Sequence, residues 1–176
     1  VELSASAADV VFIASTSELR HYDGTNWSAW TLPSSGGNIV AVSVGVRGLP
    51  FLIRGSTLFR WNGLSWANLG STSAEGLSAT SDGSAFTTNG DCSNYGWRTL
   101  RLFRWDSVNG TQSLIDNYAS GYEYCHGPDR FTVVGLSSNL AWVGGRTTFS
   151  RAWEGAANVY ALPGHLVSPL SAGQGY

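Results

Sequence analysis

The residues of this chain that could take part in chemistry gather in two segments, 91–98 and 118–129. The carboxylates Asp91, Glu123 and Asp129 are of the type that glycosidases use as an acid–base pair. Aromatic rings that stack on the C–H faces of sugars stand among them, with an imidazole; these residues are Tyr95, Trp97, Tyr118, Tyr122, Tyr124 and His126. Tyr and Trp also dominate the hot spots of protein interfaces. The two segments therefore predict a binding site for a glycan or for a protein.

No catalytic motif accompanies these carboxylates. The sequence has no Gly-x-Ser-x-Gly elbow, no His-Glu-x-x-His pair and no phosphate-binding loop. Its three histidines, at positions 21, 126 and 165, lie far apart in the chain. We therefore expect no catalytic residue, no metal site and no cofactor, and a glycoside hydrolase remains an alternative.

A repeat determines the elements that must position these side chains. An aromatic residue beside Asp, Asn or Glu, preceded by Arg, recurs at Tyr22, Trp61, Trp105 and Trp153. The spacing of roughly 40–50 residues is typical of a four-stranded propeller blade. In the first two repeats Asp-Gly or Asn-Gly follows the aromatic, which predicts a tight hairpin turn at that point.

Each repeat divides into four short apolar runs bounded by Gly, Ser, Asn and Pro, which predict β-strands. The first runs are 1–6, 38–46, 76–81 and 130–136, and the second are 10–14, 50–54, 84–88 and 140–144. The third are 18–22, 57–61, 100–105 and 148–153, and the fourth are 27–32, 66–69, 112–115 and 159–162. No segment has a helical period with caps, so we expect little or no helix.

These runs predict an all-β fold, a four-bladed β-propeller of four-stranded antiparallel blades in a single domain over residues 1–176. The blades are expected at about 1–37, 38–75, 76–121 and 122–163, followed by a tail at 164–176. We expect a compact ring, in which the tail replaces the first strand or pairs beside it. A part of a larger propeller is the alternative. Pro169 restricts the tail to a sheet edge, because it donates no ladder hydrogen bond.

The two cysteines fall in expected insertions, Cys92 in 89–99 and Cys125 in 117–129. In a propeller these two connections emerge on the same face, which favours a Cys92–Cys125 disulfide and an oxidising compartment. Two buried free thiols are the alternative. A zinc site is not expected, because a cysteine pair and His126 supply too few ligands.

The repeated aromatics have two interpretations. Large flat side chains at equivalent positions fill the wedge between neighbouring blades, as Trp61 and Trp105 would do. They could instead form one sugar site per blade, with avidity from several sites. The tryptophans of the fourth, outermost strands, including Trp27, Trp30 and Trp66, are better placed for solvent and for ligands. The aromatics of the 118–129 segment could likewise only cover the seam between blades three and four.

Composition limits the partners. The net charge of −2 and the absence of Lys leave no basic field for nucleic acid. No run of about 18 apolar residues could span a membrane as a helix. Charged residues make up only 12% of the chain, whereas Gly and Trp are frequent, as in surface β-proteins outside cells. The chain starts with Val and has no signal peptide, so we expect a mature or excised secreted product.

The segments ELRHYDGTNWSAW and TLFRWNGLSWANLG resemble the repeats of tectonin-like and fucose-binding propeller lectins, and the LxRxDGxxW blades of bacterial secreted surface proteins. This resemblance implies a non-catalytic propeller that binds glycans or surface proteins, often between blades. The Asp-box of sialidase-like propellers is also similar. Asp23-Gly24 lacks the residue that the Asp-box places between Asp and Gly, which weakens a glycosidase assignment.

The sequence therefore favours an extracellular, lectin-like binding module. Its expected ligand-binding residues are Asp91, Tyr95, Trp97, Tyr122, Tyr124, His126, Asp129, Trp27 and Trp66. The expected partners are a glycan or a cell-surface protein, with homo-oligomers possible. The alternatives are a structural or adhesive subunit of a surface assembly or filament, and a glycoside hydrolase.

Overall fold

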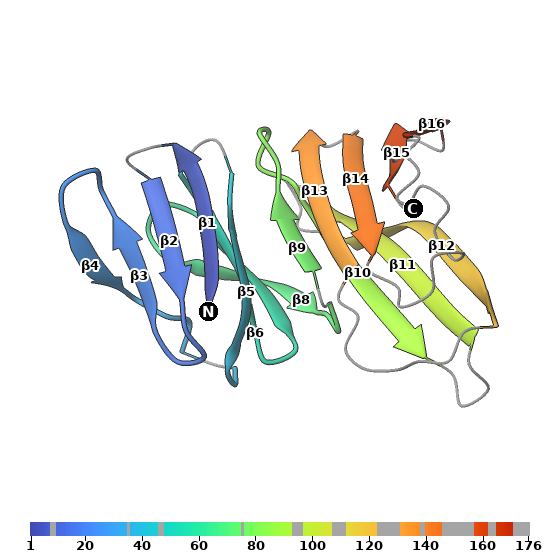
Figure 1. Ribbon diagram of the computed structural model, residues 1–176. Helices are drawn as coiled ribbons and strands as arrows, with labels where there is room; N and C mark the ends of the chain where they lie inside the picture. Colours follow the sequence, from blue (N-terminus) through green and yellow to red (C-terminus); the bar gives the residue numbers. More distant parts are fainter. Residues whose placement is uncertain are drawn as a thin grey trace.

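The computed structural model describes residues 1–7, 10–34, 36–45, 48–74, 76–92, 97–106, 112–122, 131–137, 140–145, 157–161 and 165–170. Within these ranges the chain forms strands and no helix, arranged as four antiparallel sheets of four strands each (Figure 1). In every sheet the strands follow one another in chain order, so each is an up-and-down blade. The predicted all-β propeller fold is confirmed.

The first two blades follow the sequence prediction closely. Blade 1 comprises β1 (Glu2–Ala7), β2 (Val10–Ala14), β3 (Leu19–Tyr22) and β4 (Trp27–Trp30). Blade 2 comprises β5 (Ile39–Val44), β6 (Pro50–Arg54), β7 (Thr57–Trp61) and β8 (Trp66–Ser71). The agreement arises because each apolar run here ends at a turn residue.

Blade 3 differs from the prediction in the length of its strands. It comprises β9 (Gly76–Ala79), β10 (Ala85–Cys92), β11 (Trp97–Trp105) and β12 (Gln112–Tyr122). Residues expected in loops at 89–99 and 117–129 thus partly continue the ladder, with Cys92 opposite Arg98 and Trp97 opposite Tyr122. Thr, Asn and Tyr can extend a hairpin beyond its apolar part, because the ladder satisfies their backbone groups.

Blade 4 is shifted along the sequence from its expected position. It comprises β13 (Phe131–Ser137), β14 (Leu140–Gly145), β15 (Ala157–Ala161) and β16 (His165–Leu170). The run expected as its fourth strand is therefore its third, and the expected tail supplies the fourth. The expected third strand, 148–153, lies outside the described residues. β16 pairs with β15 at the edge of the sheet, where Pro169 was expected to lie.

The blades are joined in series through their inner strands. β1 contacts β5, β5 contacts β9, and β9 contacts β13. In the part of the chain that the structure describes, no comparable contact joins blade 4 to blade 1, and blade 1 lies apart from β13 and β14 of blade 4 (Figure 1). The described blades thus form an open arc and not the expected compact ring. The number of sequence repeats predicts the number of blades, but the angle between neighbouring blades depends on how their side chains pack.

Two apolar layers hold the first three blades together. The layer between blades 1 and 2 contains Phe12, Leu19, Leu52 and Phe59. The layer between blades 2 and 3 contains Phe51, Ile53, Leu58 and Trp105. The Trp105 side chain is only 1% exposed, and its Nε1 donates to Thr87 Oγ1 at 2.9 Å. This confirms the wedge-filling interpretation for Trp105.

Replacing Trp105 with Ala should lower the free energy of unfolding by about 3–5 kcal/mol, because it empties the layer between blades 2 and 3. Leu64 is a matched apolar control, since it is 90% exposed in the turn after β7. Leu64→Ala should change the free energy of unfolding by less than about 0.5 kcal/mol. Urea denaturation of both variants measures the difference, and equal losses would contradict this assignment of the core.

The turns after β3 and β7 are built in the same way from different residues. Asp23 Oδ1 accepts the backbone N–H groups of Thr25 and Asn26 at 2.9 and 2.8 Å. Asn62 Oδ1 accepts two backbone N–H groups at 2.9 Å in the equivalent turn. Gly24 and Gly63 follow with φ of 93° and 102°, a conformation that favours glycine. The repeated Asp and Asn are thus turn-forming residues.

The hydrogen bond from the Asn26 backbone, followed by that from Thr25, lowers the pKa of Asp23 below its usual value of 3.8. A depressed pKa in the folded state stabilises the protein above the unfolded pKa, and that stabilisation is lost as the pH falls through the folded pKa. Asp23→Asn keeps the acceptor but not the charge, so its unfolding free energy should fall less between neutral and strongly acidic pH.

The reciprocal variant Asn62→Asp should acquire the acid sensitivity that Asp23→Asn loses. Urea unfolding of the wild type and both variants, repeated from neutral pH down to about pH 2, tests the pair. Identical acid profiles for all three proteins would show that the carboxylate of this turn does not contribute to pH-dependent stability.

Candidate functional site

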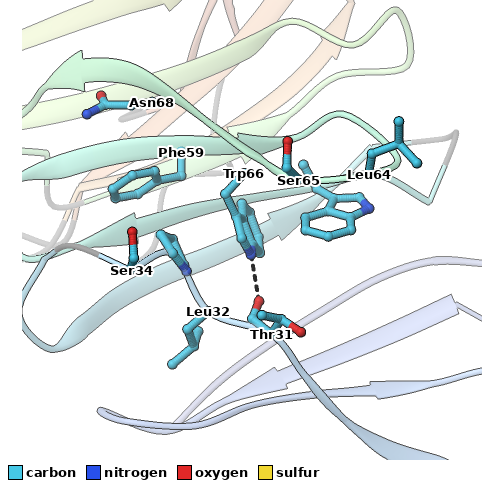
Figure 2. A pocket seen from close by; sticks show the side chains of 10 residues that line it. Thr31, Leu32, Ser34, Phe59, Leu64, Ser65, Trp66 and Asn68 are labelled. Carbon is cyan, nitrogen blue, oxygen red and sulfur yellow. Dashed lines mark hydrogen bonds between the residues drawn. The ribbon is translucent and has the colours of Figure 1, made fainter.

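A cleft of about 450 Å³ opens between the segment that leaves β4 and the β7–β8 hairpin (Figure 2). Blade 1 contributes the wall at residues 31–34, and blade 2 contributes the opposite wall. The lining residues are Thr31, Leu32, Pro33, Ser34, Phe59, Trp61, Leu64, Ser65, Trp66 and Asn68. The cleft therefore lies at the outer end of the interface between two blades.

The aromatic residues of the cleft continue a row that begins inside blade 1. Trp30 of β4 meets Trp61 of β7 edge to face, with ring centroids 5.5 Å apart. Trp61 meets Trp66 in the same manner at 5.4 Å, because these two residues are register partners in β7 and β8. Phe59 and Trp61 are two residues apart and therefore lie on the same face of β7, the face that packs against blade 1. The strand period thus places two indoles in the cleft.

Hydrogen bonds fix the wall that blade 1 contributes. The Nε1 of Trp66 donates to the backbone oxygen of Thr31 at 2.6 Å, which ties the two walls together (Figure 2). Arg54 of β6 donates through Nε to Gly37 O at 2.9 Å and through Nη1 to Pro33 O. The segment between the blades is therefore held in a defined shape although it contains no regular structure.

The chemistry of the lining is neutral. The polar side-chain groups of the lining are the hydroxyls of Thr31, Ser34 and Ser65 and the amide of Asn68, and Leu64 lies at the rim (Figure 2). None of the lining residues is Asp, Glu, His, Cys, Lys or Arg. The cleft can therefore stack on an apolar surface and exchange hydrogen bonds, but it contains no side chain suited to general acid–base chemistry at neutral pH.

The expected ligand-binding tryptophans of the outer strands separate in space. Trp66 lines the cleft. Trp27 lies on the opposite face of blade 1, 47% exposed, and packs on Tyr22 with ring centroids 5.3 Å apart. Sequence reasoning assigned Trp61 to wedge filling and did not select Leu64. The sequence did contain a signal for Leu64, because this apolar residue stands in a hairpin turn at the position where blade 1 has the polar Thr25.

Most of the second predicted site lies outside the described residues. These are Tyr95, Tyr124, His126, Asp129 and Cys125, so the disulfide with Cys92 also stays a prediction. The backbone places Asp91 in β10 opposite Thr99, and Trp97 directly opposite Tyr122 at the far end of β11 and β12. Two of the predicted aromatics are thus neighbours on adjacent strands.

The described residues show neither a metal-binding cluster nor a membrane-spanning helix. They contain no group of three or more His, Cys, Asp or Glu side chains that could hold a metal ion. No helix long and apolar enough to cross a membrane occurs among them.

Comparison with solved structures supports the fold. Hsv2 of Kluyvelomyces marxianus, a β-propeller, matches with a TM-score of 0.51 and 8% sequence identity, over 90% of this chain and 54% of Hsv2. Virginiamycin B lyase from Staphylococcus aureus matches with a TM-score of 0.44 and 8% identity, over 81% of this chain and 61% of the lyase. KlHsv2 with loop 6CD replaced by a Gly-Ser linker matches with a TM-score of 0.41 and 8% identity, over 79% of this chain and 60% of that protein. The chain spans 54–61% of these proteins. No protein-family model and no curated protein matches the sequence.

Arg54→Lys should weaken the blade 1 wall of the cleft, because a single ammonium group cannot reproduce the fork that reaches both Pro33 and Gly37. We expect the free energy of unfolding to fall by about 1–2 kcal/mol. The matched control is Arg20→Lys, since the Arg20–Glu18 ion pair at 2.8 Å is about half exposed. That variant should remain within about 0.5 kcal/mol of the wild type in urea unfolding. Equal effects of the two substitutions would contradict the role given to Arg54.

Proposed function

We propose that this chain is a non-catalytic, secreted binding module that holds a carbohydrate in the cleft between blades 1 and 2. The observation that carries the proposal is the edge-to-face pair of indoles, Trp61 and Trp66, in a neutral cleft of about 450 Å³. Sugar rings present apolar C–H faces and a border of hydroxyls, which match an indole face with hydroxyl and amide groups around it.

The composition of the cleft supports a neutral ligand. Because no lining side chain carries a charge, neither a phosphate nor an acidic sugar would find a counter-charge there. The volume lies within the range of about 300–1,000 Å³ that is typical of small-molecule sites, so one or two neutral sugar rings fit best. A cell-surface glycan or glycoprotein is accordingly the partner that we propose.

Binding to a panel of neutral mono- and oligosaccharides, measured by glycan array and by calorimetry, tests the proposal. Leu64→Asp places a charge at the exposed rim without touching the core, and Trp66→Leu removes one indole. Both should weaken binding at least about tenfold, because Trp66→Leu removes a stacking surface and Leu64→Asp places a charge where a neutral ligand enters the cleft. Trp27→Ala is the control, because it removes an exposed tryptophan outside the cleft and should leave affinity unchanged.

A fourth variant separates this site from the other one that the sequence suggests. Trp97→Ala alters the β11–β12 end of blade 3 and should not change sugar affinity if the cleft is the site. Loss of binding in Trp97→Ala with full binding in Leu64→Asp would overturn the cleft and favour the blade 3 rim. No binding to any neutral sugar by the wild type would overturn the carbohydrate proposal itself.

A further inference from the structure

Asn68 is a polar residue of the cleft that the repeat does not account for. In blade 2 it stands opposite Phe59, two residues after Trp66. In blade 1 the corresponding residue, two after Trp27, is Ala29. Both blades therefore have an aromatic residue at the start of the fourth strand, but of the two only the blade whose indoles line the cleft has an amide beside it.

A backbone hydrogen bond fixes the orientation of the Asn68 amide. Its Oδ1 accepts the N–H of Gly70 at 2.9 Å. Because a backbone N–H can only donate, the oxygen must face Gly70 and the Nδ2 group must face away from it. Among the residues that the structure describes, Nδ2 has no hydrogen-bond partner. Asn68 therefore offers the cleft two donors, while its acceptor is engaged within β8.

Acceptors on the opposite wall are engaged as well. The backbone oxygen of Thr31 accepts from Trp66 Nε1 at 2.6 Å, and that of Pro33 accepts from Arg54 Nη1. The hydroxyls of the lining donate as readily as they accept. The polar groups left for a ligand thus favour one that carries a strong hydrogen-bond acceptor.

The position of Asn68 suits a substituent of a sugar ring that stacks on the indoles. Trp66 and Asn68 are two residues apart on the same face of β8, which separates them by roughly 6–7 Å along the strand. Asn68 and its register partner Phe59 lie away from Leu64 at the rim (Figure 2). An acetyl group combines a carbonyl oxygen, which would accept from Nδ2, with a methyl group suited to the apolar lining of Phe59 and Leu32.

We propose that Asn68 makes the cleft selective for neutral sugars that carry an acetyl group, either as an acetamide or as an acetate ester. This inference rests on the carbohydrate-binding function proposed above. The acetyl oxygen accepts a hydrogen bond from Asn68 Nδ2, and the methyl group packs on the apolar lining. An unsubstituted sugar has only a hydroxyl at that place, which is a weaker acceptor and leaves the apolar lining uncovered.

Calorimetric titrations with an N-acetylated hexosamine, an O-acetylated hexose and the parent hexose test the proposal. The wild type should bind at least one acetylated sugar about fivefold or more tightly than the parent, the combined effect of one neutral hydrogen bond and one buried methyl group. The acetylated sugar that binds more tightly then identifies the acetamide or the ester as the recognised group.

Asn68→Asp is the decisive variant, because it keeps the oxygen that accepts the Gly70 N–H and removes both donors. Its thermal unfolding should match that of the wild type, and its preference for the acetylated sugar over the parent should fall at least about threefold. Since the sugars are all neutral, the ratio of their affinities separates the loss of the donors from the added charge. Asn62→Asp makes the same exchange in the β7–β8 turn, at a residue that does not line the cleft, and should keep the wild-type ratio.

The outcomes separate this inference from the proposed function. Equal affinity of the wild type for the acetylated and parent sugars would overturn the selectivity and leave carbohydrate binding in place. A preference that Asn68→Asp retains in full would overturn the role of Asn68. A wild type that binds none of these sugars would overturn both proposals.

Discussion

The structure depends on the packing of one blade face against the next. A blade alone has two apolar faces and buries neither, so each becomes stable only when a neighbour covers it. The third strand supplies a tryptophan at two of the junctions, Trp61 between blades 1 and 2 and Trp105 between blades 2 and 3. Trp105 is enclosed, whereas Trp61 reaches the outer end of its junction and remains partly open to solvent.

This difference between equivalent positions produces the candidate site. Where the junction closes fully, the tryptophan belongs to the core and donates to Thr87. Where it stays open, a second tryptophan from β8 and the segment leaving β4 form the walls of a cleft. The same packing rule therefore creates a structural layer between blades 2 and 3 and the candidate cleft between blades 1 and 2.

The sequence predicted a strand accurately where the local signals for its ends were strong. Strands bounded by Asp, Ser, Gly, Asn or Pro, such as β2, β6 and β7, were predicted to the residue, because turn chemistry is local. The long hairpins of blade 3 were not, since polar residues at 89–92 and 117–122 are compatible with either loop or strand. Blade 4 was displaced because the signature at Trp153 was taken to mark its third strand. Trp66 was predicted to bind a ligand from its place on an outer strand, and it lines the cleft.

By itself, the sequence determined the repeat, the strand period and the turns, because these depend on neighbours within a few residues. Asp23 and Asn62 form their turns through their own backbone whatever the rest of the chain does. The tertiary structure alone decided whether Trp61 and Trp105 would be core or surface, which walls meet to form the cleft, and whether the ring closes. Those outcomes depend on the angle and depth at which whole sheets pack, and the side chains of both blades set that geometry together.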